Sequence, residues 1–475
     1  FLEVQPANQL IVQSLDDVEK LLGGYLIGAV QIGNTVNAGL SVLDPINYFG
    51  VHHYSDEFSF YQWGRNNGFD YINDETFARL ADFKCNGHGE IVWNGMYNCI
   101  GIMNAVIIEA EKSIKGNQNQ EDYILGEART WRAYCYLKLL QYFSPYNDIK
   151  DYKADISSLG VPVITDGYKL LADVDLRRKP QKEVYELIIS DLGEALTRVQ
   201  RSQPKQGFSL FYNDRFINGM LAKVYWYKAL SPAKESDDWA KAEKYATDAI
   251  GGRALSADID EFREIFDTGN KEITNNECPL RIVKGDGNGT LPFQFLRTRQ
   301  TDASYTQFTD NDIRKSVYFT TSNFILDPNQ IGTLFLDFTQ NKHQTNLLTG
   351  NYLNYWWSDA RLSEMFLIRA EAIERQGGNA RPLLNEFQAS RYLPGQPVTS
   401  ASVLDDIITE RRKEFIYELD HRWIDNKRLA VAVTRTIDGI TYTLDGHDYR
   451  YCLRIPDREL ELNTQLDQNP GWFNQ

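Results

Sequence analysis

Apolar and small residues recur at steps of three and four along much of the chain, the spacing of one face of an α-helix. One face of the segment 127–143 carries five of them: Ala128, Trp131, Cys135, Leu139 and Tyr142. The segment ends before Pro145, which cannot continue a helix because proline has no amide proton. The pattern therefore predicts an amphipathic helix over residues 127–143.

The same spacing predicts further helices at 182–199, 216–230, 239–250, 362–376, 380–391 and 405–419. Residues 216–250 read as helix, short break and helix, with small residues where the two cross, over about the length of a tetratricopeptide unit. No strict repeat is visible. The pattern predicts a mostly α fold of degenerate, tetratricopeptide-like helix pairs.

Two regions, 42–89 and 281–357, break the helical pattern. Both are rich in Gly, Asn, Asp and aromatic residues, and the second alternates turns with short strand-like runs. Long irregular segments inside a compact domain are more often binding loops than filler. We predict one domain over 1–475, with its parts as follows: a helical scaffold at roughly 76–275 and 358–430, ligand-facing loops at 42–75 and 281–357, and a C-terminal tail at 431–475.

The loops hold the residue types that bind sugars. A sugar ring presents an apolar C–H face to aromatic rings and a rim of hydroxyls to polar side chains. The candidate ligand-binding residues are Tyr61, Trp63, Arg65 and Asn66 in the first loop, and Phe295, Arg297 and Tyr305 in the second. The competing interpretation is that these aromatics anchor long loops to the scaffold. Trp63 is the strongest candidate, since glycine and polar residues surround it.

Charge and composition exclude several classes of protein. The 475 residues carry a net charge of −15. That charge disfavours a nucleic-acid binder, which needs a basic surface, and docking on an anionic membrane surface. We expect no membrane-spanning helix, because no apolar run approaches the roughly 20 residues that one needs.

Motifs for catalysis and for zinc are missing. The sequence has no HExxH helix, no Gly-x-Ser-x-Gly elbow, no P-loop and no CxxC pair. Cys135 is expected to be a small core residue, and a Cys85–Cys99 disulfide remains open. Cys85 and His88 supply only two metal ligands, and His52 with His53 is better read as a loop contact.

Two further groups of residues admit a metal or a structural role. Asp310 and Asp312 fit part of a hard-cation site, but a solvated helix N-terminus is the preferred interpretation. His421 lies between an acid and a base, which favours a buried, hydrogen-bonded structural histidine over a ligand or catalytic base. We also expect Trp93, Trp356, Trp357 and Trp423 to be structural.

Charges concentrate in the segment 410–429, which reads Glu-Arg-Arg-Lys-Glu-Phe-Ile-Tyr-Glu-Leu-Asp-His-Arg-Trp-Ile-Asp-Asn-Lys-Arg-Leu. Helical pairs of opposite charge add only about 0.2–0.5 kcal/mol each, so helix stability does not explain the density. Arginine forks that meet carboxylates inside the fold explain it better. We therefore read this segment as a structural part of the scaffold.

This segment resembles the C-terminal signature of the SusD/RagB family of outer-membrane nutrient-binding lipoproteins. Other matching segments, in the family's order, are Phe-Leu-x-Val-x-Pro at 1–6, Trp93 to Asn104, Glu127 to Tyr134, and Ile455-Pro456 with Asn469-Pro470-Gly471-Trp472. The departure is Leu419-Asp420, where the family usually has glycine.

The resemblance implies a right-handed tetratricopeptide-like scaffold and no catalysis. It implies capture of oligosaccharides, or in some members peptides, and delivery to a SusC-like TonB-dependent transporter. The protein would face outward on the outer membrane, held by a lipid on a cysteine upstream of Phe1. No cofactor is implied, although some members carry a structural calcium ion. The alternatives from other classes are a glycoside hydrolase on a helical scaffold and a tetratricopeptide-like protein that binds only proteins.

Overall fold

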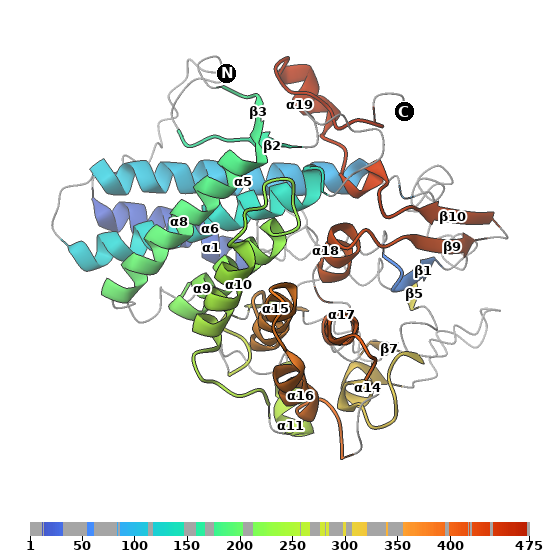
Figure 1. The fold of residues 1–475 in the computed structure, drawn as a ribbon. Coiled ribbons are helices and arrows are strands. Elements are labelled where there is room, and N and C mark those ends of the chain that lie inside the picture. The colour runs from blue at the N-terminus through green and yellow to red at the C-terminus, as the bar shows by residue number, and fades with distance from the viewer. Residues whose placement is uncertain are drawn as a thin grey trace, which may run out of the picture.

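Long helices, each packed against the next along the chain, form the body of the protein (Figure 1). The computed structural model describes residues 12, 14–31, 55–60, 83, 86–112, 117–146, 158–166, 175–202, 212–256, 258–266, 276–280, 282–284, 298–300, 306–320, 339–340, 355–394, 399–416, 418, 420–437 and 440–472. The helices are α1 (Leu15–Gln31), α5 (Asn86–Lys112), α6 (Gln118–Phe143), α8 (Gln181–Arg201), α9 (Asp214–Lys228), α10 (Asp238–Ile250), α11 (Ile259–Glu264), α14 (Ile313–Tyr318), α15 (Leu362–Arg375), α16 (Arg381–Ala389), α17 (Val403–Glu414), α18 (His421–Arg428) and α19 (Asp457–Leu462).

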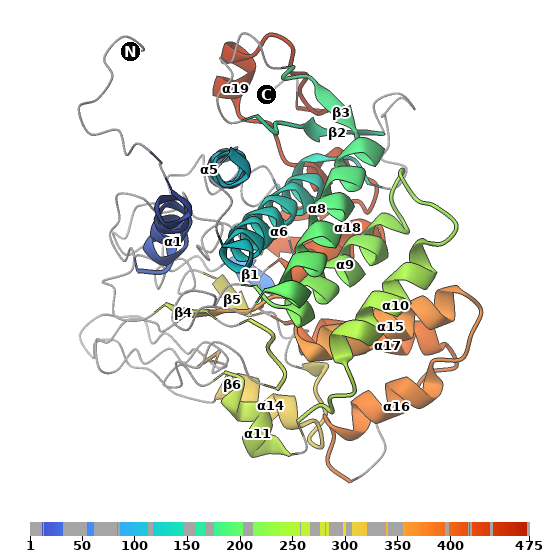
Figure 2. The ribbon, with the colours of Figure 1, turned by 90° about the vertical axis from the view of Figure 1, so that its left-hand side faces the viewer.

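These helices succeed one another through the molecule. Helix α1 packs against α5, α5 against α6, α6 against α8, and α8 against α9; the series continues through α10 and α15 to α17. Figure 2 shows this succession running from α1 on one side to α15 and α17 on the other. The mostly helical fold predicted from periodicity is confirmed.

Strands are short, and within the described residues they pair only in twos. They are β1 (Phe58–Phe60), β2 (Leu159–Pro162), β3 (Arg178–Pro180), β4 (Ile282–Lys284), β5 (Thr298–Gln300), β6 (Phe319–Thr320), β7 (Thr339–Gln340), β8 (Tyr355–Trp357), β9 (Val433–Ile437) and β10 (Ile440–Leu444). The antiparallel pairs are β1 with β5, β2 with β3, β4 with β8, β6 with β7 and β9 with β10. Both β1–β5 and β4–β8 join residues far apart in the sequence.

Local sequence sets the helix ends. Asn117 caps α6 by accepting a hydrogen bond from the Gln120 amide at 3.2 Å, and the helix stops at Phe143 as predicted. Gly251, at φ 55°, ends α10 in the left-handed conformation that glycine adopts without strain. Gly377, at φ 78°, follows α15 in the same way.

Helix α6 lies in the main hydrophobic core and is buried on nearly all sides. Trp131 and Tyr134 of α6 are fully buried, as is Cys135, which is a free thiol. A second, smaller core gathers around α11 and α14, with Phe262, Phe266 and Tyr318 in edge contact. The predicted role of Cys135 as a core residue is confirmed.

One helix differs from the expectation that no apolar run is long enough to cross a membrane. Residues 89–112 of α5 meet the requirements of length and composition. This helix packs between α1 and α6, and Val92, Met96 and Met103 are fully buried in the main core. Those contacts identify α5 as a core helix of the scaffold.

The end of the chain docks onto the end of α6. The Asn469 side-chain amide donates to the carbonyls of Phe143 and Leu453 at 2.9 and 2.8 Å. The Arg178 guanidinium donates to the Asn469 side-chain oxygen at 2.9 Å, and Trp472 donates to the Cys452 carbonyl at 2.8 Å. The Asn-Pro-Gly-Trp segment therefore packs against the C-terminal end of α6 and has a structural role.

The structure corrects three expectations about elements. The helix predicted over 405–419 ends at Glu414. Beyond it, the Glu418 and Asp420 side chains turn inward to bind the buried side chains of Arg361 and Lys138. Helix α18 then starts at His421, in a segment for which no separate helix was predicted. Helix α1 and the β9–β10 hairpin were not predicted.

Glu127 offers a test of the core through pH. Its carboxyl group is fully buried and accepts a hydrogen bond from the Trp131 indole at 2.6 Å. Burial raises its pKa from 4.5 to about 8 despite that bond. Because the folded-state pKa lies above the unfolded one, the contribution of Glu127 to stability is full below pH 4.5 and declines as pH rises towards 8.

We predict that Glu127→Gln, which keeps the acceptor for Trp131, removes this decline. By neutral pH the variant should exceed wild type by roughly 3 kcal/mol in unfolding free energy, since one pKa unit is worth about 1.4 kcal/mol. Urea denaturation between pH 4 and 9 measures both proteins. Parallel pH profiles for the two would contradict the assignment.

Candidate ligand-binding site

Helices α17 and α18 form a corner in which buried arginines meet buried carboxylates. Arg411 of α17 binds Asp425 of α18 at 2.9 Å and Glu364 of α15 at 2.9 Å. Arg428 of α18 binds both oxygens of Glu371 in α15, at 2.8 and 2.9 Å, and Asp425 at 2.8 Å. These are the arginine forks expected from the signature, and their partners lie mostly on α15.

Glu414, at the end of α17, is the centre of a second group. It accepts hydrogen bonds from Arg391 at 3.0 and 3.1 Å and from Arg361 at 3.3 Å. Arg361 also binds Glu418 through both carboxylate oxygens, at 2.8 and 2.9 Å. Burial alone would raise the pKa of Glu414, but the charges of Arg391 and Arg361 outweigh burial and lower it.

Trp226 links this corner to α9. The guanidinium carbons of Arg411 and Arg428 lie 4.4 and 3.9 Å from its ring centroid. Its indole nitrogen donates to Glu371 at 2.7 Å. The stacking adds a cation–π attraction to the ion pairs, which is larger where the groups are desolvated.

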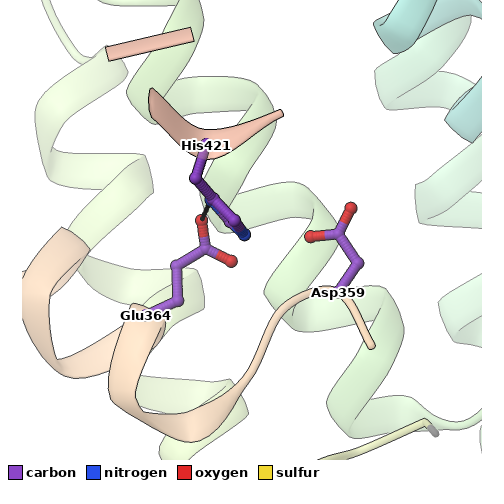
Figure 3. Close-up of side chains that lie close together, drawn as sticks. All are labelled: Asp359, Glu364 and His421. Carbon is purple, nitrogen blue, oxygen red and sulfur yellow. Dashed lines mark ion pairs between the residues drawn. The ribbon is translucent and has the colours of Figure 1, made fainter. Parts of the chain in front are cut away.

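Asp359, Glu364 and His421 are a buried group that resembles a metal or catalytic centre (Figure 3). The Lys223 ammonium binds Asp359 and lies 3.2 Å from Glu364, where it supplies the positive charge that these acids need. Burial, and then the charges of Lys223 and Arg411, hold the pKa of His421 well below its usual range. His421 is therefore neutral and buried, as predicted for a structural histidine.

A second acidic group on the scaffold is likewise matched by lysines. Lys228 binds Glu235 at 2.9 Å and Asp238 at 2.8 Å, and Lys241 binds Asp237 at 2.8 Å. Each carboxylate thus has a lysine partner, so we read this group as ion pairing at the N-terminal end of α10.

The interpretation of Asp310 and Asp312 as a solvated helix N-terminus needs correction. Asp312 does cap α14, accepting from the Arg314 amide at 3.1 Å, but it is buried. Its carboxylate binds the Arg314 guanidinium through both oxygens at 2.8 Å. Asp310 is exposed and pairs with Lys315 at 2.6 Å. Asp312 belongs to the buried ion pairs, which its charge alone did not reveal.

One ion-pair group reaches from the corner to the predicted ligand loops. The Asp56 carboxylate accepts two hydrogen bonds from Arg422 of α18, both at 2.7 Å, and one from Arg412 of α17 at 2.9 Å. We call Asp56, Arg412 and Arg422 the Asp56 clamp. Burial would raise the pKa of Asp56, but the hydrogen bond and charge of Arg422, helped by Arg412, lower it to about 2.

Strand β1 begins two residues after Asp56 and pairs with β5 in antiparallel register. Phe58 lies opposite Gln300, and Phe60 lies opposite Thr298. In the sequence, Tyr61 follows Phe60 directly and Arg297 precedes Thr298 directly. The ladder therefore joins the two predicted ligand loops, since β1 lies within 42–75 and β5 within 281–357 (Figure 1).

The predicted ligand-binding residues themselves lie outside the described residues: Tyr61, Trp63, Arg65, Asn66, Phe295, Arg297 and Tyr305. Cys85, His52, His53 and Leu419 lie outside them as well. Cys99 is buried and free in the structure. Trp93 and Trp423 are 3% and 1% exposed, which confirms their structural role.

Asp56 is the residue that sequence reasoning missed. The signature was read as arginine forks in need of carboxylates, but no local pattern named an acid more than 350 positions away as a partner. The available signal was its place two residues before the aromatic run that starts at Phe58.

Comparisons with known proteins agree with this architecture. A family model described as starch-binding, associating with outer membrane, matches residues 1–225, and the SusD family model matches residues 297–472. No curated protein matches the sequence. The chain belongs to the SusD/RagB family.

Solved structures share the fold over almost their whole length. A SusD superfamily protein from Bacteroides thetaiotaomicron is 20% identical, with a TM-score of 0.72 over 96% of this chain and 100% of that one. A SusD-like carbohydrate-binding protein from Bacteroides vulgatus is 19% identical, with a TM-score of 0.70 over 96% and 97%. Surface glycan-binding protein A from Bacteroides uniformis is 15% identical, with a TM-score of 0.68 over 96% and 99%.

The buried ion pairs predict a large cost for removing one partner. Glu414→Gln leaves Arg391 and Arg361 short of negative charge inside the protein, and we expect a loss of roughly 3–5 kcal/mol in unfolding free energy. Urea denaturation at pH 7 measures it. Asp237→Asn, which breaks an exposed pair with Lys241, is the control and should leave the unfolding free energy near that of wild type. Equal small effects for both variants would contradict a structural role for Glu414.

Proposed function

We propose that this protein binds oligosaccharides at the cell surface and delivers them to a TonB-dependent outer-membrane transporter. The observation that carries the proposal is the β1–β5 ladder, which joins the two aromatic segments at one edge of a SusD-type helical scaffold. The names of two structural neighbours, a carbohydrate-binding and a glycan-binding protein, support the same ligand class.

The chemistry of the two segments fits a glycan. Trp63 and Tyr61 offer flat apolar faces for sugar rings, and Arg65, Asn66 and Arg297 offer donors for hydroxyl groups. Such a surface binds through stacking and hydrogen bonds, so its ligands need no charge. A neutral glycan also suits a protein whose net charge is −15.

The place of action is proposed from the family. The description of the matching family model includes association with the outer membrane. We propose an outward-facing position, a lipid anchor upstream of Phe1 and a SusC-like transporter as partner. The helical scaffold would form the surface that meets this transporter.

Binding without catalysis suits the arrangement of buried acids. A glycoside hydrolase needs two carboxyl groups that flank the scissile bond, one protonated and one ionised. Glu127 has the raised pKa of a proton donor, but it is fully buried against Trp131 in the core. The buried carboxylates Glu371 and Glu414 are held by arginines that stabilise the fold.

Glycan binding is tested by a carbohydrate array followed by calorimetry, with maltoheptaose, a starch fragment, as the first probe. We predict that Trp63→Ala weakens binding by roughly fivefold or more, because one aromatic stacking contact is worth on the order of 1 kcal/mol or more. The thermal midpoint should stay close to that of wild type.

Trp239→Ala is the matched control. Trp239 is partly exposed on α10, where Arg375 lies 5.7 Å from its ring, and its loss should leave glycan affinity unchanged. Wild type that binds peptides and no array glycan would favour the peptide-binding members of the family. Release of shortened sugars from a bound oligosaccharide would favour the hydrolase alternative.

A further inference from the structure

The Asp56 clamp differs from the other ion pairs of the signature corner in its exposure. Side chains in the corner, such as Arg411 and Glu364, are 2% and 0% exposed, whereas Asp56 and Arg412 are each 27% exposed; Arg422 of the clamp is itself 8% exposed. A pair at the edge of the core contributes less to global stability than a fully buried one. The clamp is therefore poorly placed to hold the scaffold together.

Its geometry is nevertheless precise. The Arg422 guanidinium of α18 donates one hydrogen bond to each carboxylate oxygen of Asp56. Arg412 of α17 donates a third. A two-pronged contact between guanidinium and carboxylate fixes orientation as well as distance. The carboxylate of Asp56 is thus held from α17 and α18 together.

The backbone around Asp56 is anchored on both sides. Ser55 and Glu57 are each 1% exposed, and the Glu57 amide donates to the Ser55 hydroxyl at 3.3 Å. Strand β1 starts at the next residue, Phe58. A fixed Asp56 consequently fixes the point at which the chain enters β1.

The β1–β5 ladder needs such an attachment. It has three residue pairs and two strands, and a ladder of that size is marginal at best in water on its own. Strand β5 is held in place by its backbone pairing with β1, in which Phe60 lies opposite Thr298. What holds β1 therefore also holds β5.

We propose that Asp56 is a positioning residue for ligand binding: held by Arg412 and Arg422, it fixes the β1–β5 ladder to the α17–α18 corner. This proposal rests on the proposed function. The charged signature thereby acts on two levels. Its fully buried pairs stabilise the fold, and Arg412 and Arg422 place the ladder from which both aromatic segments extend.

Hydrogen–deuterium exchange with peptide mass spectrometry tests the positioning directly and needs no ligand. In Asp56→Asn, we expect exchange at the backbone amides of β1 and β5 to rise by roughly tenfold, with α6, α9 and α15 unchanged. Arg422→Gln, which removes two of the three bonds, should give a larger increase than Arg412→Gln, which removes one.

Asp406→Asn is the matched control, because Asp406 lies on α17, the helix that carries Arg412 of the clamp. Asp406 of α17 binds Arg381 at 2.7 Å, so this change breaks a partly exposed ion pair that does not reach β1. Exchange in β1 and β5 should stay as in wild type. Asp56→Glu retains the charge and should restore part of the protection that Asp56→Asn loses.

The consequence for ligand binding is measured by calorimetry on the same variants. With the array-selected oligosaccharide, or maltoheptaose as first probe, we expect Asp56→Asn to weaken affinity by about tenfold and leave the thermal midpoint close to that of wild type. Asp406→Asn should bind as wild type does. A wild-type protein that binds no glycan counts against the proposed function, and exchange still decides whether the clamp positions the ladder.

Three outcomes would overturn the proposal. Exchange in β1 and β5 that is unchanged in Asp56→Asn would show that the clamp does not hold the ladder. An equal rise throughout the scaffold, with a lower thermal midpoint, would show a purely structural pair. Wild-type affinity in an Asp56→Asn protein with a loosened ladder would separate the clamp from ligand binding.

Discussion

The pairing of buried arginines with buried carboxylates is the constraint on which the rest of this structure depends. Taking charges out of water is costly, and the cost is offset only where each charge meets well-placed partners. Helices α17 and α18 meet this condition with acids from another element, Glu364 and Glu371 of α15. The position of each helix in the corner is therefore fixed by the positions of the others.

The same constraint explains why groups that resemble active centres are structural. Lys223 of α9 and Lys138 of α6 bring positive charge to Asp359 and Asp420, so that the corner extends into the scaffold helices. Such closely matched charges leave little freedom for a proton or a metal ion. The ligand site that we propose lies apart from these groups, where the Asp56 clamp meets the β1–β5 ladder.

Hydrophobic periodicity predicted the helix ends that neighbouring residues determine, and it missed the features that depend on contacts between residues far apart in the sequence. The ends of α6 at Phe143 and of α10 at Ile250 follow from nearby proline and glycine, so sequence reasoning placed them correctly. The break between α17 and α18 depends on Glu418 and Asp420 binding residues of other helices, and no neighbouring residue signals it. For the candidate site, the aromatic segments were named from composition, but their meeting through β1 and β5 and the part played by Asp56 required three-dimensional contacts.

The contact between Asn469 and the C-terminal end of α6 has a consequence for the order of folding events. Asn469 joins the Phe143 carbonyl across 326 positions of sequence, and Arg178 reaches Asn469 across 291. Contacts of such separation form late, because a long loop must close before they contribute. Helix α6 and Arg178 lack these partners until the segment around Asn469 is available to fold. Closure of the α6 C-terminal end is therefore a late, long-range step of folding.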